Sequence, residues 1–288
     1  MGLLGKVSTA LPVDVRNSVD DFQLYVWRMY SERATSWPEA RTLIQAVAGR
    51  LGRRAYQEHL GVDLAAVAEV LRVSVKWGKV REEKARGLMI PTSEGFEVTL
   101  GGRLRSAQRV RFAIAHEYGH CLFYALDRVP PARIIPRGAA RQALYKREEG
   151  LCDSFAAALL IPEEIGSHIA DEPVSLATVA REAERLRVSM EVLLRRLLSE
   201  LGVWPEWAFY RVLLNGAESS PRVRAFYGVR VREVKSLPSE KKVQEALENG
   251  GAKENFRVLC SLLPGARLSR TRGALWAAVK ASSSEGMI

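Results

Sequence analysis

Two histidines and a glutamate in this chain have the spacing of a divalent metal site. The stretch His116-Glu117-Tyr118-Gly119-His120 has the pattern H-E-x-x-H, and the chain has four histidines in all. Four residues of a helix advance about 400° around its axis and about 6 Å along it, so both imidazoles leave one face a turn apart. Ring nitrogens placed in this way can bind one zinc ion at about 2.0–2.1 Å. Glu117 projects about 100° to the side of them and can accept a proton from a bound water.

The same pattern has a structural interpretation, in which His116 and His120 are hydrogen-bonded core residues. The flanking residues 112–115 and 121–124 are apolar and predict a buried helix. A glutamate buried beside two histidines costs free energy unless a charge lies nearby. This cost favours the metal site.

A catalytic zinc ion keeps three protein ligands and one open position, so a third ligand is needed. The candidates, at the start of a second apolar helix, are Glu148, Glu149, Cys152 and Asp153. Glu149 and Asp153 share a helix face, so one can bind the metal while the other orients an imidazole through its free N–H. We favour Glu149 as the ligand and Asp153 as the orienting group. One alternative is that Glu148 is the ligand. Another is that both glutamates are first-turn carboxylates favoured by the helix dipole, with no role at the metal. Cys152 is a soft ligand, a small packing residue or a disulfide partner of Cys121.

The elements that must position these residues begin with helices and an extended region. Apolar periodicity and punctuating Pro and Gly residues predict helices over 20–33, 39–59 and 63–71, with a break at Trp37-Pro38 and Asp63 as a cap. Alternation predicts strands over 73–77, 87–90 and 96–100, the last two joined by a hairpin turn over 91–95. We expect the strand over 96–100 to pair with an extended substrate.

Helices then dominate until about residue 203. Ser106 opens the H-E-x-x-H helix, predicted to run to 126, and a second apolar helix covers 146–160, which Pro162 ends. Two helices within 175–202, split at 187–189 with Ser189 as a cap, have a helix–turn–helix outline. Beyond them, strands over 207–214, 222–234, 256–262 and 274–279 surround a helix over 239–247, which predicts a small α+β unit.

Two stretches resemble the ImmA/IrrE family of metallopeptidases. They are QRVRFAIAHEYGH over 108–120 and EGLCDSFAAALLIP over 149–162. Tyr118 stands where the family has leucine or isoleucine, and Ala113 where it has threonine. The resemblance implies that His116, His120 and Glu149 bind the metal and that Glu117 is the catalytic acid and base. The spacing of Glu149 and Asp153 also resembles that of thermolysin-like enzymes, in which the aspartate orients a ligand.

The resemblance also implies the architecture and the substrate. The implied fold class is α+β. It consists of an N-terminal helical extension over 1–60, a zincin-like metallopeptidase core over 61–170, a helix–turn–helix-like segment over 171–203 and a C-terminal α+β domain over 204–288 that resembles a GAF-like sensor. The implied function is a zinc-dependent endopeptidase that cleaves a helix–turn–helix transcriptional repressor in a response to stress or DNA damage. Two histidines and a carboxylate also accept Mn²⁺ or Fe²⁺.

Composition bounds the remaining alternatives. The chain has three cysteines (Cys121, Cys152 and Cys260), no apolar run long enough for a membrane span and no secretory signal, so we expect a cytoplasmic protein. The net charge of +10 and the helix–turn–helix outline also suit a DNA-binding regulator, with Arg195 and Arg196 facing a groove. A third alternative is a metal-bearing sensor without peptidase activity. For the oxyanion, neither His168 nor Tyr145 is favoured over a structural role.

Overall fold

The chain folds into a mixture of helices and strands, in agreement with the predicted α+β class. The computed structural model describes residues 11–31, 36–58, 60–80, 87–102, 104, 106–134, 141–213, 222–227, 238–248, 267–271 and 274–280. Contacts divide the chain into two compact units. Unit 1 comprises Met1–Pro162 and Arg185–Ser189, and unit 2 comprises Glu163–Glu184 and Met190–Ile288. Among the described residues, no helix is long and apolar enough to cross a membrane.

Unit 1 opens with two long helices, α1 (Val13–Ser31) and α2 (Trp37–Ala55). The predicted position of the break between these helices, at Trp37-Pro38, is wrong, because these two residues form the first turn of α2. Proline is tolerated in a first turn, where its missing N–H would have no helical partner. The chain continues through a short antiparallel pair, β1 (Tyr56–Gln57) and β2 (Gly61–Val62), to α3 (Leu64–Leu71). The carboxylate of Asp63 accepts hydrogen bonds from two N–H groups of α3, which confirms the predicted cap.

A three-stranded sheet follows, in the order β3-β5-β4. Its strands are β3 (Val73–Gly78), β4 (Gly87–Pro91) and β5 (Phe96–Gly101). As predicted, β4 and β5 form an antiparallel hairpin, while β3 runs parallel to β5. Alternate residues of β5 are buried and face the helices.

The H-E-x-x-H helix is α4 (Ala107–Cys121), capped by the hydroxyl of Ser106. It ends five residues before the predicted end, because the chain turns into β6 (Tyr124–Ala125), which pairs with β7 (Ala132–Arg133). A short apolar run after a helix does not distinguish continued helix from strand. The second apolar helix, α5 (Arg141–Leu160), begins five residues earlier than predicted and ends before Pro162 as predicted.

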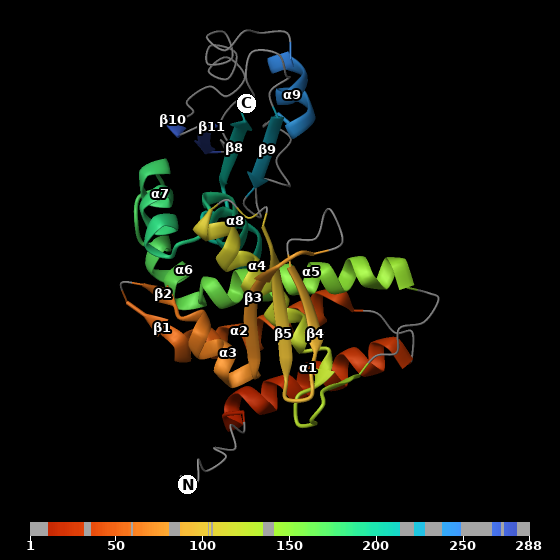
Figure 1. The fold of residues 1–288 in the computed structure, drawn as a ribbon. Helices are drawn as coiled ribbons and strands as arrows, with labels where there is room; N and C mark the ends of the chain where they lie inside the picture. Colours follow the sequence, from red (N-terminus) through yellow and green to blue (C-terminus); the bar gives the residue numbers. More distant parts are fainter. Residues whose placement is uncertain are drawn as a thin grey trace. The chain divides into compact units, whose positions relative to one another are not determined.

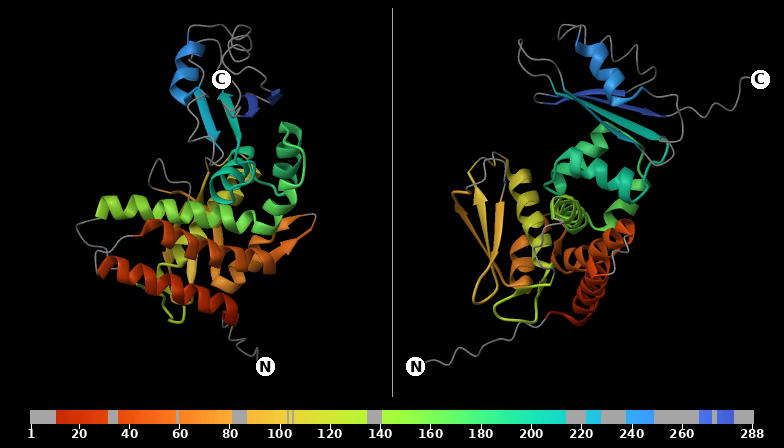
Figure 2. Two further views of the ribbon diagram at one scale, coloured as in Figure 1. Left: turned by 180° about the vertical axis from the view of Figure 1, so that it is seen from behind. Right: turned by 90° about the vertical axis from the view of Figure 1, so that its right-hand side faces the viewer.

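Unit 1 is layered, and α4 lies in its middle. Figure 1 labels the elements, and the right view of Figure 2 shows the sheet on one side of α4 and α5 on the other, followed by α2 and α1. The helix that carries the two histidines is therefore covered by a sheet on one face and by a helix on another.

Unit 2 begins with the helices α6 (Glu163–Ala170), α7 (Leu176–Arg185) and α8 (Met190–Arg195), the last of which continues as a π-helical turn, η1 (Arg196–Glu200). An antiparallel sheet follows in the order β10-β11-β8-β9. Its strands are β8 (Trp207–Leu213), β9 (Arg222–Tyr227), β10 (Arg267–Thr271) and β11 (Ala274–Lys280). Helix α9 (Glu240–Glu248) packs Val243 and Leu247 into a core with one face of this sheet.

Some predictions for this region remain outside the described residues. The predicted strand over 256–262 and Cys260 lie there, whereas β10 was not predicted. The helix–turn–helix and GAF-like assignments, and the four-part domain division, stay predictions.

Candidate metal centre

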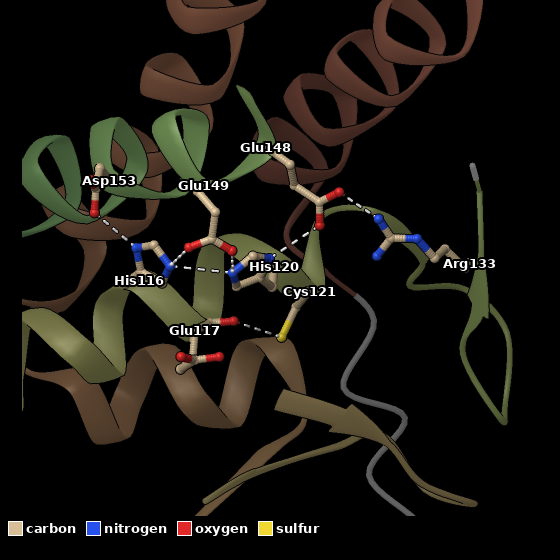
Figure 3. Close-up of polar contacts among 8 residues, drawn as sticks. All are labelled: His116, Glu117, His120, Cys121, Arg133, Glu148, Glu149 and Asp153. Atoms are coloured by element: carbon tan, nitrogen blue, oxygen red, sulfur yellow. Dashed lines mark hydrogen bonds and ion pairs between the residues drawn. The ribbon is translucent and has the colours of Figure 1, made fainter. Parts of the chain in front are cut away.

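Helices α4 and α5 bring three possible ligand atoms together. The Nε2 atoms of His116 and His120 are 3.2 Å apart. The two carboxylate oxygens of Glu149 lie 3.2 Å from these nitrogens, one beside each. Among the described residues, these three side chains form the group that could hold a metal ion (Figure 3). The structure thus brings together His116, His120 and Glu149, the residues favoured as ligands from the sequence.

The separations fit a tetrahedral ion. Ligand atoms about 2.0–2.1 Å from a zinc ion at tetrahedral angles are about 3.3–3.4 Å apart. At this site the two nitrogens are 3.2 Å apart, and each lies 3.2 Å from the nearer oxygen of Glu149, which is close to that spacing. Two neutral imidazole nitrogens would repel at that distance without a shared proton or cation, and two imidazoles with one carboxylate suit zinc. The residues therefore fit a divalent metal ion.

A close helix crossing makes this convergence possible. A Cβ atom added to Gly119 would lie 3.0 Å from the Cα atom of Cys152 on α5. Glycine at position 119 therefore permits a closer approach than a residue with a side chain would. Both helices carry buried apolar residues, namely Ala113, Ala115, Leu151, Phe155 and Ala156.

Each imidazole also has a carboxylate behind it. Asp153 Oδ1 lies 3.0 Å from Nδ1 of His116, as predicted for the orienting group. Glu148 Oε1 lies 3.2 Å from Nδ1 of His120 (Figure 3), a contact that the sequence analysis missed. The interpretation of Glu148 as a first-turn carboxylate is wrong, because α5 begins at Arg141 and Glu148 is 4% exposed.

Glu117 leaves α4 on a different side from this cluster (Figure 3). It is 6% exposed, and a Cβ atom added to Gly87, the first residue of β4, would lie 2.7 Å from its Oε1 atom. Burial raises the pKa of Glu117, although the neighbouring histidines oppose the rise. A carboxyl group whose pKa is raised toward neutrality is suited to accept and return a proton.

Mutual contacts shift the pKa values of the two histidines and of Glu149. Burial lowers the pKa of His116, but hydrogen bonds with Asp153 and Glu149 outweigh it and the pKa is raised. Burial also lowers the pKa of His120, whereas Cys152 and Glu148 raise it well above the ordinary value. Burial raises the pKa of Glu149, but hydrogen bonds with the two imidazoles bring it well below its usual range. Glu149 is thus an anion held ready for a cation, which would displace protons from the ring nitrogens.

The two cysteines near the centre are thiols. Cys121 and Cys152 are both buried and free, so the disulfide considered from the sequence is absent. Burial raises the pKa of Cys152 to about 11, although His120 opposes the rise. The group of possible metal ligands found among the described residues does not include this sulfur.

Three further expectations concern groups around the site. The prediction that the strand over 96–100 pairs with substrate is wrong, because β3 and β4 occupy both edges of this strand, β5. His168 lies on α6 in unit 2, and the side chain of Tyr145 lies outside the described part of the structure.

The helix proposed to face a DNA groove is largely buried. Arg196 is 5% exposed, and its Nη1 atom donates a hydrogen bond to Glu200 at 2.8 Å. Leu193, Leu194, Leu197 and Leu198 are fully buried. Arg195 remains as the exposed arginine of the predicted pair. This weakens the case for groove contacts by this helix.

One comparison with known proteins covers the helices that carry the candidate metal centre. Residues 98–198 match the family model described as the IrrE N-terminal-like domain, which belongs to a peptidase family. This range contains the whole of α4 and the whole of α5. Among solved structures, a Mycobacterium tuberculosis transcriptional regulator is similar over 95% of this chain and 99% of its own, with 14% identity and a TM-score of 0.48. No curated protein matches the chain.

Proposed function

We propose that this chain, a member of the ImmA/IrrE family of metallopeptidases through its residues 98–198, is a zinc-dependent endopeptidase acting on a protein substrate. The observation that carries the proposal is the convergence of His116, His120 and Glu149, each of which offers one ligand atom within 4.8 Å of the others. The H-E-x-x-H pattern adds Glu117 next to the first ligand.

The proposed roles follow from the chemistry of the side chains. His116, His120 and Glu149 would hold the ion, which when bound lowers the pKa of a water and polarises a carbonyl group. Glu117 would accept a proton at its carboxylate and pass it to the leaving amine. Its burial supports this role, because a dry carboxylate binds a proton more tightly than an exposed one.

Strand β4 is the element we assign to substrate binding. It is the outermost strand on its side of the sheet, and no described strand pairs with its outer edge. Its first residue, Gly87, lies against Glu117. An extended peptide that added to this edge would gain main-chain hydrogen bonds beside the proposed catalytic glutamate. Leu88 and Ile90, which are 50% and 42% exposed, would contact its side chains.

The proposed substrate is a helix–turn–helix transcriptional repressor, cleaved in a response to stress or DNA damage. The support is the resemblance of residues 108–162 to the ImmA/IrrE family. The experiment is incubation of the purified protein with candidate repressors, followed by mass measurement of the products. We expect fragments with zinc, none with chelator, and recovery when zinc is restored.

The variant Glu117→Gln separates an enzyme from a metal-bearing sensor. It should keep one zinc ion per chain while cleavage falls by about 100-fold or more. Cleavage that persists in this variant, or in excess chelator, would contradict the proposal. Binding to duplex DNA that weakens steeply with salt, without any cleavage, would favour the regulator instead.

A further inference from the structure

We propose that Glu148 and Arg133 are positioning residues that hold His120 in its metal-binding orientation, and that this buried support matters more than the support Asp153 gives to His116. The inference rests on the proposed metal site but not on peptidase activity. It concerns a polar contact of the centre that lies outside the H-E-x-x-H residues and the proposed third ligand.

The first step concerns the ring of His120. Its Nε2 atom faces His116 and Glu149, and its Nδ1 atom faces Glu148. When Nε2 binds a metal, Nδ1 must carry the hydrogen, which it donates to the Glu148 carboxylate. This hydrogen bond fixes both the tautomer and the ring orientation of His120.

The second step concerns the charge of Glu148. Its side chain is 5% exposed, and a buried carboxylate is costly unless it is paired. The Nη2 atom of Arg133 donates a hydrogen bond to its second oxygen, Oε2. The two oxygens thus have separate partners, Arg133 on one side and His120 on the other (Figure 3).

The third step explains why Arg133 arrives at this place. Arg133 lies on β7 and pairs with Tyr124 of β6. Tyr124 follows His120 by only four residues. Its guanidinium carbon lies 5.5 Å from the centroid of the Tyr124 ring and 6.0 Å from that of Phe123. Arg133 is therefore held by the short hairpin that follows α4, and its position is tied to the end of that helix.

The N-terminal helix fixes this hairpin in turn. The amide of Gln23 on α1 donates hydrogen bonds to the carbonyl oxygens of Leu122, at 3.1 Å, and Tyr124, at 2.9 Å. The rings of Phe22 and Phe123 pack edge to face. A helix far outside the matched range 98–198 thus helps to support one metal ligand.

The two orienting carboxylates differ in burial. The Asp153 side chain is 48% exposed, whereas that of Glu148 is 5% exposed. Water weakens the hydrogen bond of the exposed aspartate and can replace it when it is removed. Glu148 is shielded from water, so we expect the ring of His120 to depend more strongly on its carboxylate than the ring of His116 depends on Asp153.

The test measures zinc affinity of the full chain by competition with a chromophoric chelator. Glu148→Ala should weaken zinc binding by about 10- to 100-fold, the usual effect of losing such a partner, and Asp153→Ala by less. Glu148→Gln preserves the shape and an acceptor oxygen, so it should fall between wild type and Glu148→Ala. The matched control is Glu182→Gln, which alters another buried glutamate, 4% exposed, in unit 2 and should leave zinc affinity unchanged.

A double variant tests the role of Arg133. Arg133→Met alone should weaken zinc binding several-fold, but should add little in the Glu148→Ala background because it acts through Glu148. The d–d spectrum of the cobalt-substituted protein should change in Glu148→Gln, since the His120 ring is less firmly held. Urea unfolding of each zinc-free variant identifies any that fail to fold, and Glu148→Gln serves in place of Glu148→Ala in that case.

Several results would overturn the inference. Zinc affinity of folded Glu148→Ala and Glu148→Gln equal to wild type would do so, as would a larger loss in Asp153→Ala. Abolished binding in Glu148→Ala with retained binding in Glu149→Ala would make Glu148 a ligand instead. Absence of cleavage with an intact affinity ranking would contradict the proposed function alone.

Discussion

At the scale of single residues, the arrangement around each ligand is as informative as the ligands themselves. His116 and His120 each contact Glu149 through Nε2 and a different carboxylate through Nδ1. An imidazole held from both sides presents one nitrogen to an ion without losing rotational freedom on binding. Pairing with carboxylates also explains how two histidines are accommodated in a largely buried site.

A residue-scale prediction concerns Gly87. The variant Gly87→Ala should reduce peptidase activity by about 10-fold or more while zinc binding stays unchanged. The added Cβ atom would lie 2.7 Å from Glu117 Oε1, so the carboxylate must move, and misplacement of a catalytic group by about 1 Å can cost about 100-fold in rate. The measurement compares cleavage rate and zinc stoichiometry in the same preparation.

The matched control for this prediction is Gly102→Ala. A Cβ atom at position 102 would meet nothing within 4 Å, so activity should stay at the wild-type level. Equal activity in both variants would show that Gly87 does not constrain Glu117.

At the scale of elements, the centre depends on how closely α4 and α5 approach each other. Glycine at position 119 lets the backbone of α4 lie against Cys152 of α5. The two histidines of α4 and Glu149 of α5 are then close enough to bind one ion together. The H-E-x-x-H spacing gives the two imidazoles, but the site is complete only where the second helix passes.

An element-scale prediction tests this crossing. Gly119→Ala should destabilise the protein by about 1–3 kcal/mol, as overpacking a core commonly does, and should also weaken zinc binding. The added Cβ atom would lie 3.0 Å from Cys152 Cα and 3.2 Å from its Cβ, so the backbone of α5 must yield by a few tenths of an ångström. Urea unfolding of the zinc-free protein and a zinc competition assay give the two quantities.

Gly150→Ala is the control on the partner helix. It lies inside α5, where a Cβ atom would meet nothing within 4 Å. Because alanine favours helix over glycine, this variant should gain up to about 1 kcal/mol. A loss of stability in Gly150→Ala as large as that in Gly119→Ala would argue against a specific effect at the crossing.

At the scale of the whole molecule, the three proposed metal ligands all belong to unit 1. Unit 2 has its own sheet, with a core formed by that sheet and α9. The net charge of +10 belongs to the chain as a whole. Because the three proposed ligands lie in unit 1, metal binding should change the stability of the two units unequally.

The corresponding prediction concerns heat denaturation. Zinc at about 1,000 times its dissociation constant should stabilise unit 1 by about 4 kcal/mol, because it binds the folded state. In calorimetry, chelator should lower the transition temperature of unit 1 and leave that of unit 2 unchanged. In His116→Ala, chelator should have no effect on either. An equal shift of both transitions in the wild-type protein would contradict the assignment of the metal to unit 1.

The sequence by itself determined the parts of this protein that depend on local chemistry. The spacing of His116 and His120, the cap residues Asp63 and Ser106 and the stop at Pro162 can be read along the chain, because each acts within a few residues of itself. The β4–β5 hairpin was predictable for the same reason.

Only the tertiary structure decided which distant residues meet. It placed β5 in the centre of its sheet, turned the chain into β6 where helix was expected, and brought Glu148 to His120 from 28 residues away. Periodicity reports which face of an element is apolar but not which neighbour covers it. The support of His120 by Glu148 and Arg133 depends on such a neighbour, so it became visible only after α4, α5 and the β6–β7 hairpin were packed together.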